Sequence, residues 1–235
     1  MRLALLIFDI GKSILAIYLI TGSNRGIGLE FCRQLKERGD EVIATCRSSS
    51  KELDALDIQV ASGIDITSMN SILNLKNKLN SLKVDVMIHN AGIAENNQLT
   101  NLSAASLKRQ FEVNALGPLL FVQSMLENLR HGSKVGLITS RMGSIEDNTS
   151  GGSYGYRMSK AALCMAGKSL SIDLKPSGIS VALLHPGLVR TRMTGFTQNG
   201  ISTEQAVIGL LQRIDSLSLK TSGNFWHANG EILPW

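Results

Sequence analysis

Apolar runs rich in β-branched residues alternate with amphipathic stretches through most of the chain. Short runs without polar interruption are typical of strands buried on both faces, and the amphipathic stretches are typical of covering helices. The alternation therefore predicts repeated βα units, an α/β fold with a doubly wound parallel sheet of about seven strands and helices on both faces. The predicted strands cover residues 16–21, 41–46, 58–63, 84–90, 134–140, 179–185 and, more weakly, 223–226. The predicted helices cover residues 26–38, 68–80, 104–130, 153–174 and 202–216.

The 235 residues show no repeat and no Pro-, Ser- or charge-rich linker, which predicts one domain over residues 15–235. Residues 1–14 precede the first strand as an extension of uncertain role. Their apolar run is interrupted by Asp9 and Lys12, lacks a small-residue cleavage site and falls short of the roughly 20 residues that span a bilayer. We expect no membrane partner.

The charge and the cysteines exclude several classes of protein. The net charge is +5, but the basic residues are scattered rather than clustered, so we expect no nucleic-acid partner. Cys32, Cys46 and Cys164 are odd in number and far apart, which favours neither a disulfide framework nor a metal site. A reducing cytoplasm suits this pattern.

The sequence TGSNRGIG at residues 21–28 follows the first strand and opens a helix. Glycines allow a tight turn in which backbone N–H groups approach a pyrophosphate, and the helix N-terminus adds partial positive charge. The turn is thus a candidate phosphate-binding element of a Rossmann fold, although small residues here could also serve only helix packing.

The second strand ends at Cys46 and Arg47, where an acidic residue would bind a ribose 2′-hydroxyl and repel a 2′-phosphate. Arg47 and Arg25 could instead flank that phosphate with charge-assisted hydrogen bonds. NADP(H) is therefore preferred and NAD(H) remains possible, as does an ordinary loop role for Arg47.

Tyr156 and Lys160 stand four apart at the start of a predicted helix and so share one face of it. A nearby ammonium and a cationic nicotinamide favour phenolate and are expected to lower the pKa of the phenol. The phenol could then donate a proton to a carbonyl oxygen as hydride reaches the carbon, or remove one from an alcohol.

Two further polar residues and two loops complete the candidate site. Ser140, at the end of the fifth strand, could bind the substrate oxygen or merely cap a turn, and Asn114 needs a hydrogen-bonding partner if it faces inward. The loops at residues 143–153 and 191–202 follow strands and can border a ligand site. In the second loop, Met193 and Phe196 suggest an apolar lid or, equally, core packing.

Seven motifs stand in order over nearly the whole chain: TGSNRGIG at 21–28, DIT at 65–67, NAG at 90–92, VNALG at 113–117, ITS at 138–140, YRMSK at 156–160 and HPGLVRT at 185–191. Together they resemble the motifs of the short-chain dehydrogenase/reductase family. The stretch at 140–163 and the terminal GEILPW look like the C-factor and sniffer branch of carbonyl reductase-like proteins.

The resemblance implies a catalytic tetrad of Asn114, Ser140, Tyr156 and Lys160, with Asn114 positioning a water in a proton relay that reaches Lys160. It also implies that Asp65 contacts adenine, that Lys160 holds the nicotinamide ribose, and that the nicotinamide amide is held by Pro186, Gly187, Val189 and Thr191. The cofactor-binding set is then Gly22, Ser23, Asn24, Arg25, Gly26, Ile27, Gly28, Arg47, Asp65, Ile66, Asn90, Ala91, Gly92, Tyr156, Lys160, Pro186, Gly187, Val189 and Thr191.

Three features depart from the family pattern. Ser140 lies sixteen positions before Tyr156, more than is usual, so the intervening loop must bulge, and Ser144 or Ser153 could be mistaken for the catalytic serine. His89 replaces the first asparagine of the common NNAG, which we expect to matter little. The N-terminal extension is the third.

The sequence thus predicts an NADP(H)-dependent oxidoreductase, a short-chain dehydrogenase acting on CH–OH donors, that reduces a small-molecule aldehyde or ketone with Tyr156 as proton donor. The alternative is a cofactor-binding sensor or signalling protein with little turnover. A homodimer could form through the predicted helix at residues 153–174, whose apolar residues could equally serve the core.

Overall fold

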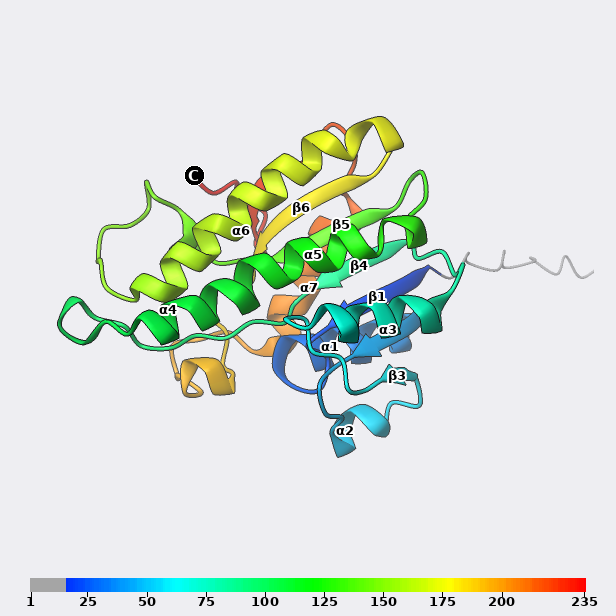
Figure 1. The fold of residues 1–235 in the computed structure, drawn as a ribbon, viewed down its shortest axis with the longest axis horizontal. Helices are drawn as coiled ribbons and strands as arrows, with labels where there is room; N and C mark the ends of the chain where they lie inside the picture. Colours follow the sequence, from blue (N-terminus) through cyan, green and yellow to red (C-terminus); the bar gives the residue numbers. More distant parts are fainter. Residues whose placement is uncertain (1–15) are drawn as a thin grey trace, which may run out of the picture.

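The computed structural model describes residues 16–235, so the predicted extension at residues 1–14 lies outside the described residues. The described chain forms a seven-stranded sheet in the order β3-β2-β1-β4-β5-β6-β7, and every neighbouring pair is parallel (Figure 1). The doubly wound α/β prediction is confirmed. The strands are β1 (Ile17–Thr21), β2 (Glu41–Thr45), β3 (Gln59–Ala61), β4 (Val86–His89), β5 (Lys134–Ile138), β6 (Ser180–His185) and β7 (Phe225–His227).

Successive strand residues are buried against opposite layers, which explains the unbroken apolar runs. Leu19, Ile43 and Met87 pack into one core cluster, while Ile20 and Ile88 pack into the other. All five side chains have no exposed surface. The sheet therefore carries a core on each face.

Helices cover both faces. Figure 1 shows α3, α4, α5 and α6 on the face toward the viewer, with α1 and α7 behind the sheet. The bounds are α1 (Gly26–Arg38), α2 (Lys51–Asp54), α3 (Met69–Leu79), α4 (Ala104–Phe111), α5 (Gly117–Ser124), α6 (Tyr154–Asp173) and α7 (Thr203–Asp215). None of the helices in the described part of the chain has the length and apolarity to cross a membrane.

One helix prediction is wrong in detail. The single helix expected over residues 104–130 is divided by a π-helical turn, Glu112–Leu116, and α5 ends at Ser124, before a short 3₁₀ turn, Leu126–Asn128. Pro118 has no N–H to donate to the carbonyl of residue 114, so a regular ladder cannot continue there. At Gly117 a Cβ would come within 2.9 Å of the Ile66 oxygen, so the close approach of the helix to that loop also depends on glycine.

The strand order reverses between β1 and β4, because β2 and β3 lie on one side of β1 and β4 to β7 on the other. At such a switch point the loops leaving two adjacent strands diverge and open a crevice at the carboxyl edge of the sheet. The predicted glycine turn follows β1 and the predicted Asn90 motif follows β4. The topology therefore brings both to one crevice.

Candidate active site

A cavity of about 1190 Å³ occupies this crevice. It is lined by fifteen of the residues predicted from the sequence: Gly22, Asn24, Arg25, Gly26, Ile27, Arg47, Asp65, Ile66, Asn90, Ala91, Gly92, Tyr156, Lys160, Pro186 and Thr191. Six predicted residues do not line it: Ser23, Gly28, Asn114, Ser140, Gly187 and Val189. The structure thus gathers most of the predicted residues around one space.

The glycine turn is held by Asn90 from β4. The Asn90 Nδ2 donates to the main-chain oxygens of Thr21 (3.2 Å) and Gly22 (3.1 Å), and the Thr21 hydroxyl accepts from the N–H groups of Asn90 and Ala91 (3.1 Å each). A Cβ on Gly28 would lie 2.2 Å from the Gly22 oxygen. Gly28 is therefore needed to close the turn, although it does not reach the cavity.

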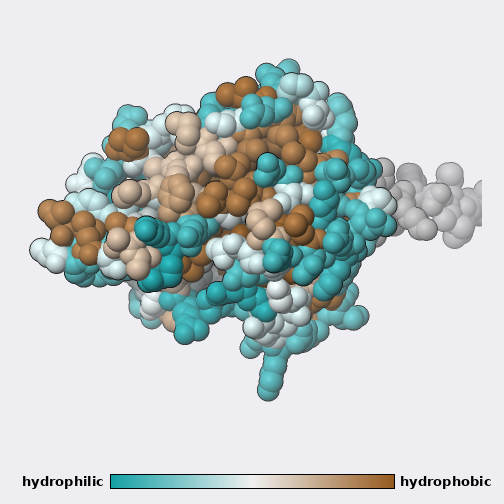
Figure 2. Space-filling model, in the orientation of Figure 1, coloured by the Kyte–Doolittle hydropathy of each residue, from teal (hydrophilic) through white to brown (hydrophobic). Residues whose placement is uncertain are grey.

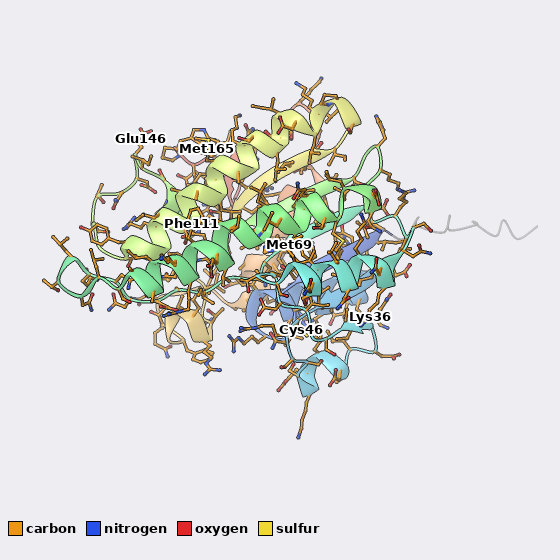
Figure 3. The ribbon with its side chains drawn as sticks, viewed as in Figure 1. Lys36, Cys46, Met69, Phe111, Glu146 and Met165 are labelled. Atoms are coloured by element: carbon orange, nitrogen blue, oxygen red, sulfur yellow. The ribbon has the colours of Figure 1, made fainter. Side chains whose placement is uncertain are left out.

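The start of α1 suits an anion. Its N-cap residue, Arg25, makes no side-chain capping hydrogen bond, so the first-turn N–H groups keep the partial positive charge of an uncapped helix N-terminus. Asn24 donates to the Ser48 oxygen (2.9 Å), which joins the turn to the loop after β2. That loop carries Arg47 just beyond Cys46, whose position is labelled in Figure 3. Arg25 and Arg47 are both exposed and make no ion pair within residues 16–235.

Asp65 also lines the cavity, close enough to Arg47 to feel its charge. Its Oδ1 accepts from the N–H (2.9 Å) and the hydroxyl (2.8 Å) of Thr67. The backbone hydrogen bond from Thr67 is the main cause that holds the pKa of Asp65 below its ordinary value, and Arg47 adds to it. The carboxylate is thus fixed in its charged form beside the predicted phosphate-binding arginine.

Tyr156 and Lys160 both lie in the first part of α6 and both line the cavity. Lys160 is 4% exposed, its Nζ lies 5.7 Å from the centre of the Tyr156 ring, and it donates to the Ile138 oxygen at 2.9 Å. Burial lowers the pKa of Lys160 from 10.5 to about 8. The ammonium is therefore poised to titrate near neutrality.

The Tyr156 phenol departs from expectation. In the protein alone its pKa is raised, not lowered, because burial outweighs a hydrogen bond with the Ser140 hydroxyl that acts in the opposite direction. Ser140 is itself buried, caps a 3₁₀ turn (Arg141–Gly143) and accepts from the Met142 N–H at 3.2 Å. The strand predicted to reach residue 140 ends at Ile138.

Asn114 faces inward, with no exposed surface, and lies in the π-helical turn. Each of its side-chain amide atoms is hydrogen-bonded: Oδ1 accepts from the Ile93 N–H (2.8 Å), and Nδ2 donates to the Ile93 oxygen (2.8 Å) and the Ser159 hydroxyl (3.0 Å). Gly92 lies between this residue and the lysine, since a Cβ there would be 3.2 Å from Asn114 Oδ1 and 3.6 Å from Lys160 Nζ.

His89 directly precedes this segment. It is 1% exposed and its ring packs edge-on against Phe121, with 5.6 Å between the ring centres. Burial lowers its pKa to about 3, and nearby Lys160 adds to that effect. The histidine is therefore neutral at physiological pH.

Several lining residues escaped the sequence analysis. The loop after β6 contributes Arg190 and Arg192, and the loop after β4 contributes Ile93 and Ala94. Arg190 lies within the HPGLVRT motif but had no predicted role, and the only sequence signal of the other three was their place in loops that follow strands. Met193 and Phe196 also line the cavity and are 50% and 63% exposed, which excludes core packing as their role.

Comparison with known proteins agrees with this geometry. The short chain dehydrogenase family model matches residues 16–201. The chain is 42% identical to a 1-hydroxy-2-glutathionyl-2-methyl-3-butene dehydrogenase from a Rhodococcus species, over 92% of this chain and 98% of that one. It is 46% identical to the C-signal protein of Myxococcus xanthus, over 65% of this chain and 93% of that one.

Two solved structures are similar throughout. The NADPH-bound carbonyl reductase from chicken fatty liver superposes with a TM-score of 0.86 at 29% identity, covering 94% of this chain and 99% of that one. The carbonyl reductase Sniffer of D. melanogaster superposes with a TM-score of 0.84 at 28% identity, covering 94% and 100%.

The fold and the crevice define a Rossmann-type oxidoreductase that uses a nicotinamide cofactor. The chain belongs to the short-chain dehydrogenase/reductase family and resembles its C-factor and sniffer branch, as its motifs predicted.

The buried ammonium of Lys160 should cost stability. Below pH 8 the lysine is protonated in both the folded and the unfolded state, so the folded state bears the full free-energy cost of burying the charge. Between pH 8 and 10.5 the folded state releases this proton while the unfolded state keeps it, so the cost decreases as the pH rises. We expect Lys160→Met to raise the free energy of unfolding at pH 7 by at most about 3 kcal/mol, and by much less at pH 10. Denaturant titrations at both pH values measure this. A lower stability at pH 7 would contradict it.

Proposed function

We propose that this protein is an NADP(H)-dependent oxidoreductase that reduces an aldehyde or ketone to an alcohol, with Tyr156 as proton donor. The observation that carries the proposal is that Tyr156 and Lys160 line the same cavity as the glycine turn and the two arginines. A phenol, an ammonium and an anion-binding helix N-terminus thus face one space. The three unpaired, buried cysteines suit work in a reducing cytoplasm.

The residues present fit a dinucleotide. The glycine turn leaves an uncapped helix N-terminus, and around Gly26, whose φ is +57°, the nearest atom to an added Cβ would be a Thr191 methyl at 3.7 Å. Such an open cradle suits a pyrophosphate. Arg25 and Arg47 would hold the 2′-phosphate, Asp65 the adenine, Lys160 the ribose, and Pro186 and Thr191 the nicotinamide amide. When bound, the cofactor supplies the hydride.

The chain's own residues handle the proton. Burial keeps the Tyr156 phenol protonated, as a proton donor must be, and Ser140 can bind the same substrate oxygen and stabilise its negative charge. Lys160 stabilises the phenolate that remains. Since the Asn114 side chain is already bonded to Ile93 and Ser159, a water in the relay would be held by the Asn114 main-chain oxygen, to which Pro118 cannot donate.

The substrate end of the cavity favours a small or medium apolar carbonyl compound. Met193 and Phe196 line it with exposed apolar side chains that burial of such a substrate would cover. The Rhodococcus relative is named for an alcohol that carries a glutathionyl group. Substrate screens should therefore include carbonyl compounds both with and without a thioether conjugate.

The preference for NADPH can be tested by binding and by substitution of Arg47. We expect NADPH to raise the melting temperature more than NADH, and Arg47→Asp to weaken NADPH binding by roughly 10- to 100-fold, the value of a lost charge-assisted hydrogen bond. Lys220→Asp, an exposed site outside the cavity, makes the same charge change and is the control. Equal stabilisation by both nucleotides would contradict the phosphate-binding role of Arg47.

The proton-donor role of Tyr156 can be tested by removing its hydroxyl. Replacement by phenylalanine removes the proton donor while keeping the ring, so kcat should fall by roughly 100-fold or more with NADPH affinity retained. Tyr154→Phe, two residues earlier in α6 and 36% exposed, should leave kcat near wild type. NADPH binding without turnover of any carbonyl by the wild type would favour the sensor alternative.

We further propose a homodimer through the outer face of α6. Met158, Met165 and Ile172 are 58%, 68% and 62% exposed and stand seven residues apart, which makes one apolar stripe along the helix. Figure 2 shows apolar side chains gathered over α4 to α6 on this face. Figure 3 labels Phe111 on α4 and Met165 on the neighbouring α6. Two copies related by a two-fold axis can each cover the other's stripe.

A charge in the stripe tests the dimer. Met165→Glu should convert the wild-type dimer to a monomer in sedimentation or light-scattering measurements, because a carboxylate is costly to bury without a partner. Ile208→Glu places the same charge on α7, on the opposite face of the sheet, where the side chain is 47% exposed, and should leave the dimer intact. A wild type that is monomeric at high concentration would disprove this part.

A further inference from the structure

The end of the chain packs on the turn that carries Ser140. The main-chain oxygen of Trp235 accepts three hydrogen bonds from the segment just after that turn: from the Ser144 hydroxyl (3.0 Å), the Ile145 N–H (3.0 Å) and the Glu146 N–H (2.9 Å). Glu146 is labelled in Figure 3, on the loop between β5 and α6. Three donors that converge on one oxygen from residues 144–146 tie the 231–235 tail to the loop at 144–153.

The tail is itself anchored to the sheet. The Leu233 N–H donates to the Phe225 oxygen in β7 (2.8 Å), and the Leu233 side chain is 2% exposed. The Trp235 ring lies 5.7 Å from the Phe225 ring, and the Lys168 ammonium of α6 lies 6.0 Å from its centre. Trp235 therefore connects the loop, which its main-chain oxygen binds, to β7 and α6, which its ring contacts through Phe225 and Lys168.

Side chains add a second link. Arg141 pairs with Asp147 of the loop (2.6 Å) and with Glu231 of the tail (3.0 Å). The Ser144 hydroxyl, besides donating to Trp235, accepts from the Asp147 N–H (3.0 Å). Both ends of the short turn at residues 141–143 are thus fastened to residues of the tail.

The turn at residues 141–143 connects the tail to Ser140 and to α6, which carries Tyr156 and Lys160. Ser140 accepts from the Gly143 N–H with its main-chain oxygen (2.8 Å) and from the Met142 N–H with its hydroxyl. On the other side, a Cβ on Gly143 would lie 2.7 Å from the Lys160 carbonyl carbon, so the turn is in close contact with α6. A shift of the turn would therefore move Ser140 relative to Tyr156 and Lys160.

We propose that Trp235 is a positioning residue for the reaction: by holding the turn at residues 141–143 through Ser144, Ile145 and Glu146, it sets the direction of the Ser140 hydroxyl toward Tyr156. The inference rests on the proposed function. It also gives the long segment between Ser140 and Tyr156 a structural role, because Ser144, Ile145 and Glu146 of that segment bind the tail. Trp235 acts only through Ser140, so its loss should affect turnover and spare cofactor binding.

The test compares Trp235→Ala with Trp235→Phe, which keeps a ring against Phe225. A second control, Trp226→Ala, removes a partly buried tryptophan that packs on the core cluster containing Ile20 and Ile88. We expect kcat to fall by roughly tenfold in Trp235→Ala, with NADPH affinity within about twofold of wild type, and to recover largely in Trp235→Phe. Trp226→Ala should lower the melting temperature without this selective loss of kcat.

A double-mutant cycle with Ser140→Ala identifies the route. If Trp235 acts through Ser140, Trp235→Ala should cost little further activity once the Ser140 hydroxyl is absent, whereas independent effects would add and overturn the proposal. Amide hydrogen exchange supplies a readout that needs no turnover. Trp235→Ala keeps the acceptor oxygen but removes the ring that fixes it on Phe225, so it should expose the Ile145 and Glu146 amides and the Gly143 amide of the turn, and unchanged protection there would also overturn the proposal. An inactive wild type with the amide coupling intact would instead count against the proposed enzyme.

Discussion

The hydrogen bonds of Asn90 are the interaction on which the rest of the site depends. At the switch point between β1 and β4 the loops that leave the two strands diverge. The side-chain amide of Asn90 links these loops by donating to the main-chain oxygens of Thr21 and Gly22. This link sets the path of the glycine turn and therefore the direction of α1. It also brings the loop after β4, with Gly92, beside Lys160. Asn90 thus holds the glycine turn after β1 against the loop after β4, and that loop in turn lies beside Lys160 of α6, so all three border one cavity.

Burial shifts the pKa values of two titratable groups in the site, Lys160 and Tyr156. Lys160 is held in its charged form among buried neighbours, at a cost in stability, while the same burial keeps the Tyr156 phenol protonated. A proton donor that is fully protonated and an ammonium that stabilises its conjugate base are both useful to carbonyl reduction. His89, neutral and packed on Phe121, adds no competing charge.

Helix α6 serves three surfaces at once. Its first turns present Tyr156 and Lys160 to the cavity, its buried side packs on the sheet through Leu163 and Gly167, and its outer stripe remains apolar. A Cβ on Gly167 would come within 2.8 Å of Leu183, so the helix lies as close to the sheet as a glycine allows. This close packing makes the helix a rigid support for the two residues that it presents.

The order of strands and helices and the parallel sheet followed from the sequence alone, because hydrophobic periodicity and glycine placement are local properties. About half of the cavity lining was also predicted: the glycine turn, the two arginines and the Tyr156/Lys160 pair from the residues themselves, and Asp65, Asn90 and Pro186 only from the resemblance to the family. The π-helical turn, the short strand ends and the raised pKa of Tyr156 did not, since each depends on what packs against the segment: Ile66 and Ile93 against the divided helix, and buried surroundings around the phenol. The contact between Trp235 and the loop at 144–146 joins residues about ninety positions apart. Only the tertiary structure could decide it, because a main-chain oxygen carries no signal in a sequence until folding brings its donors within reach.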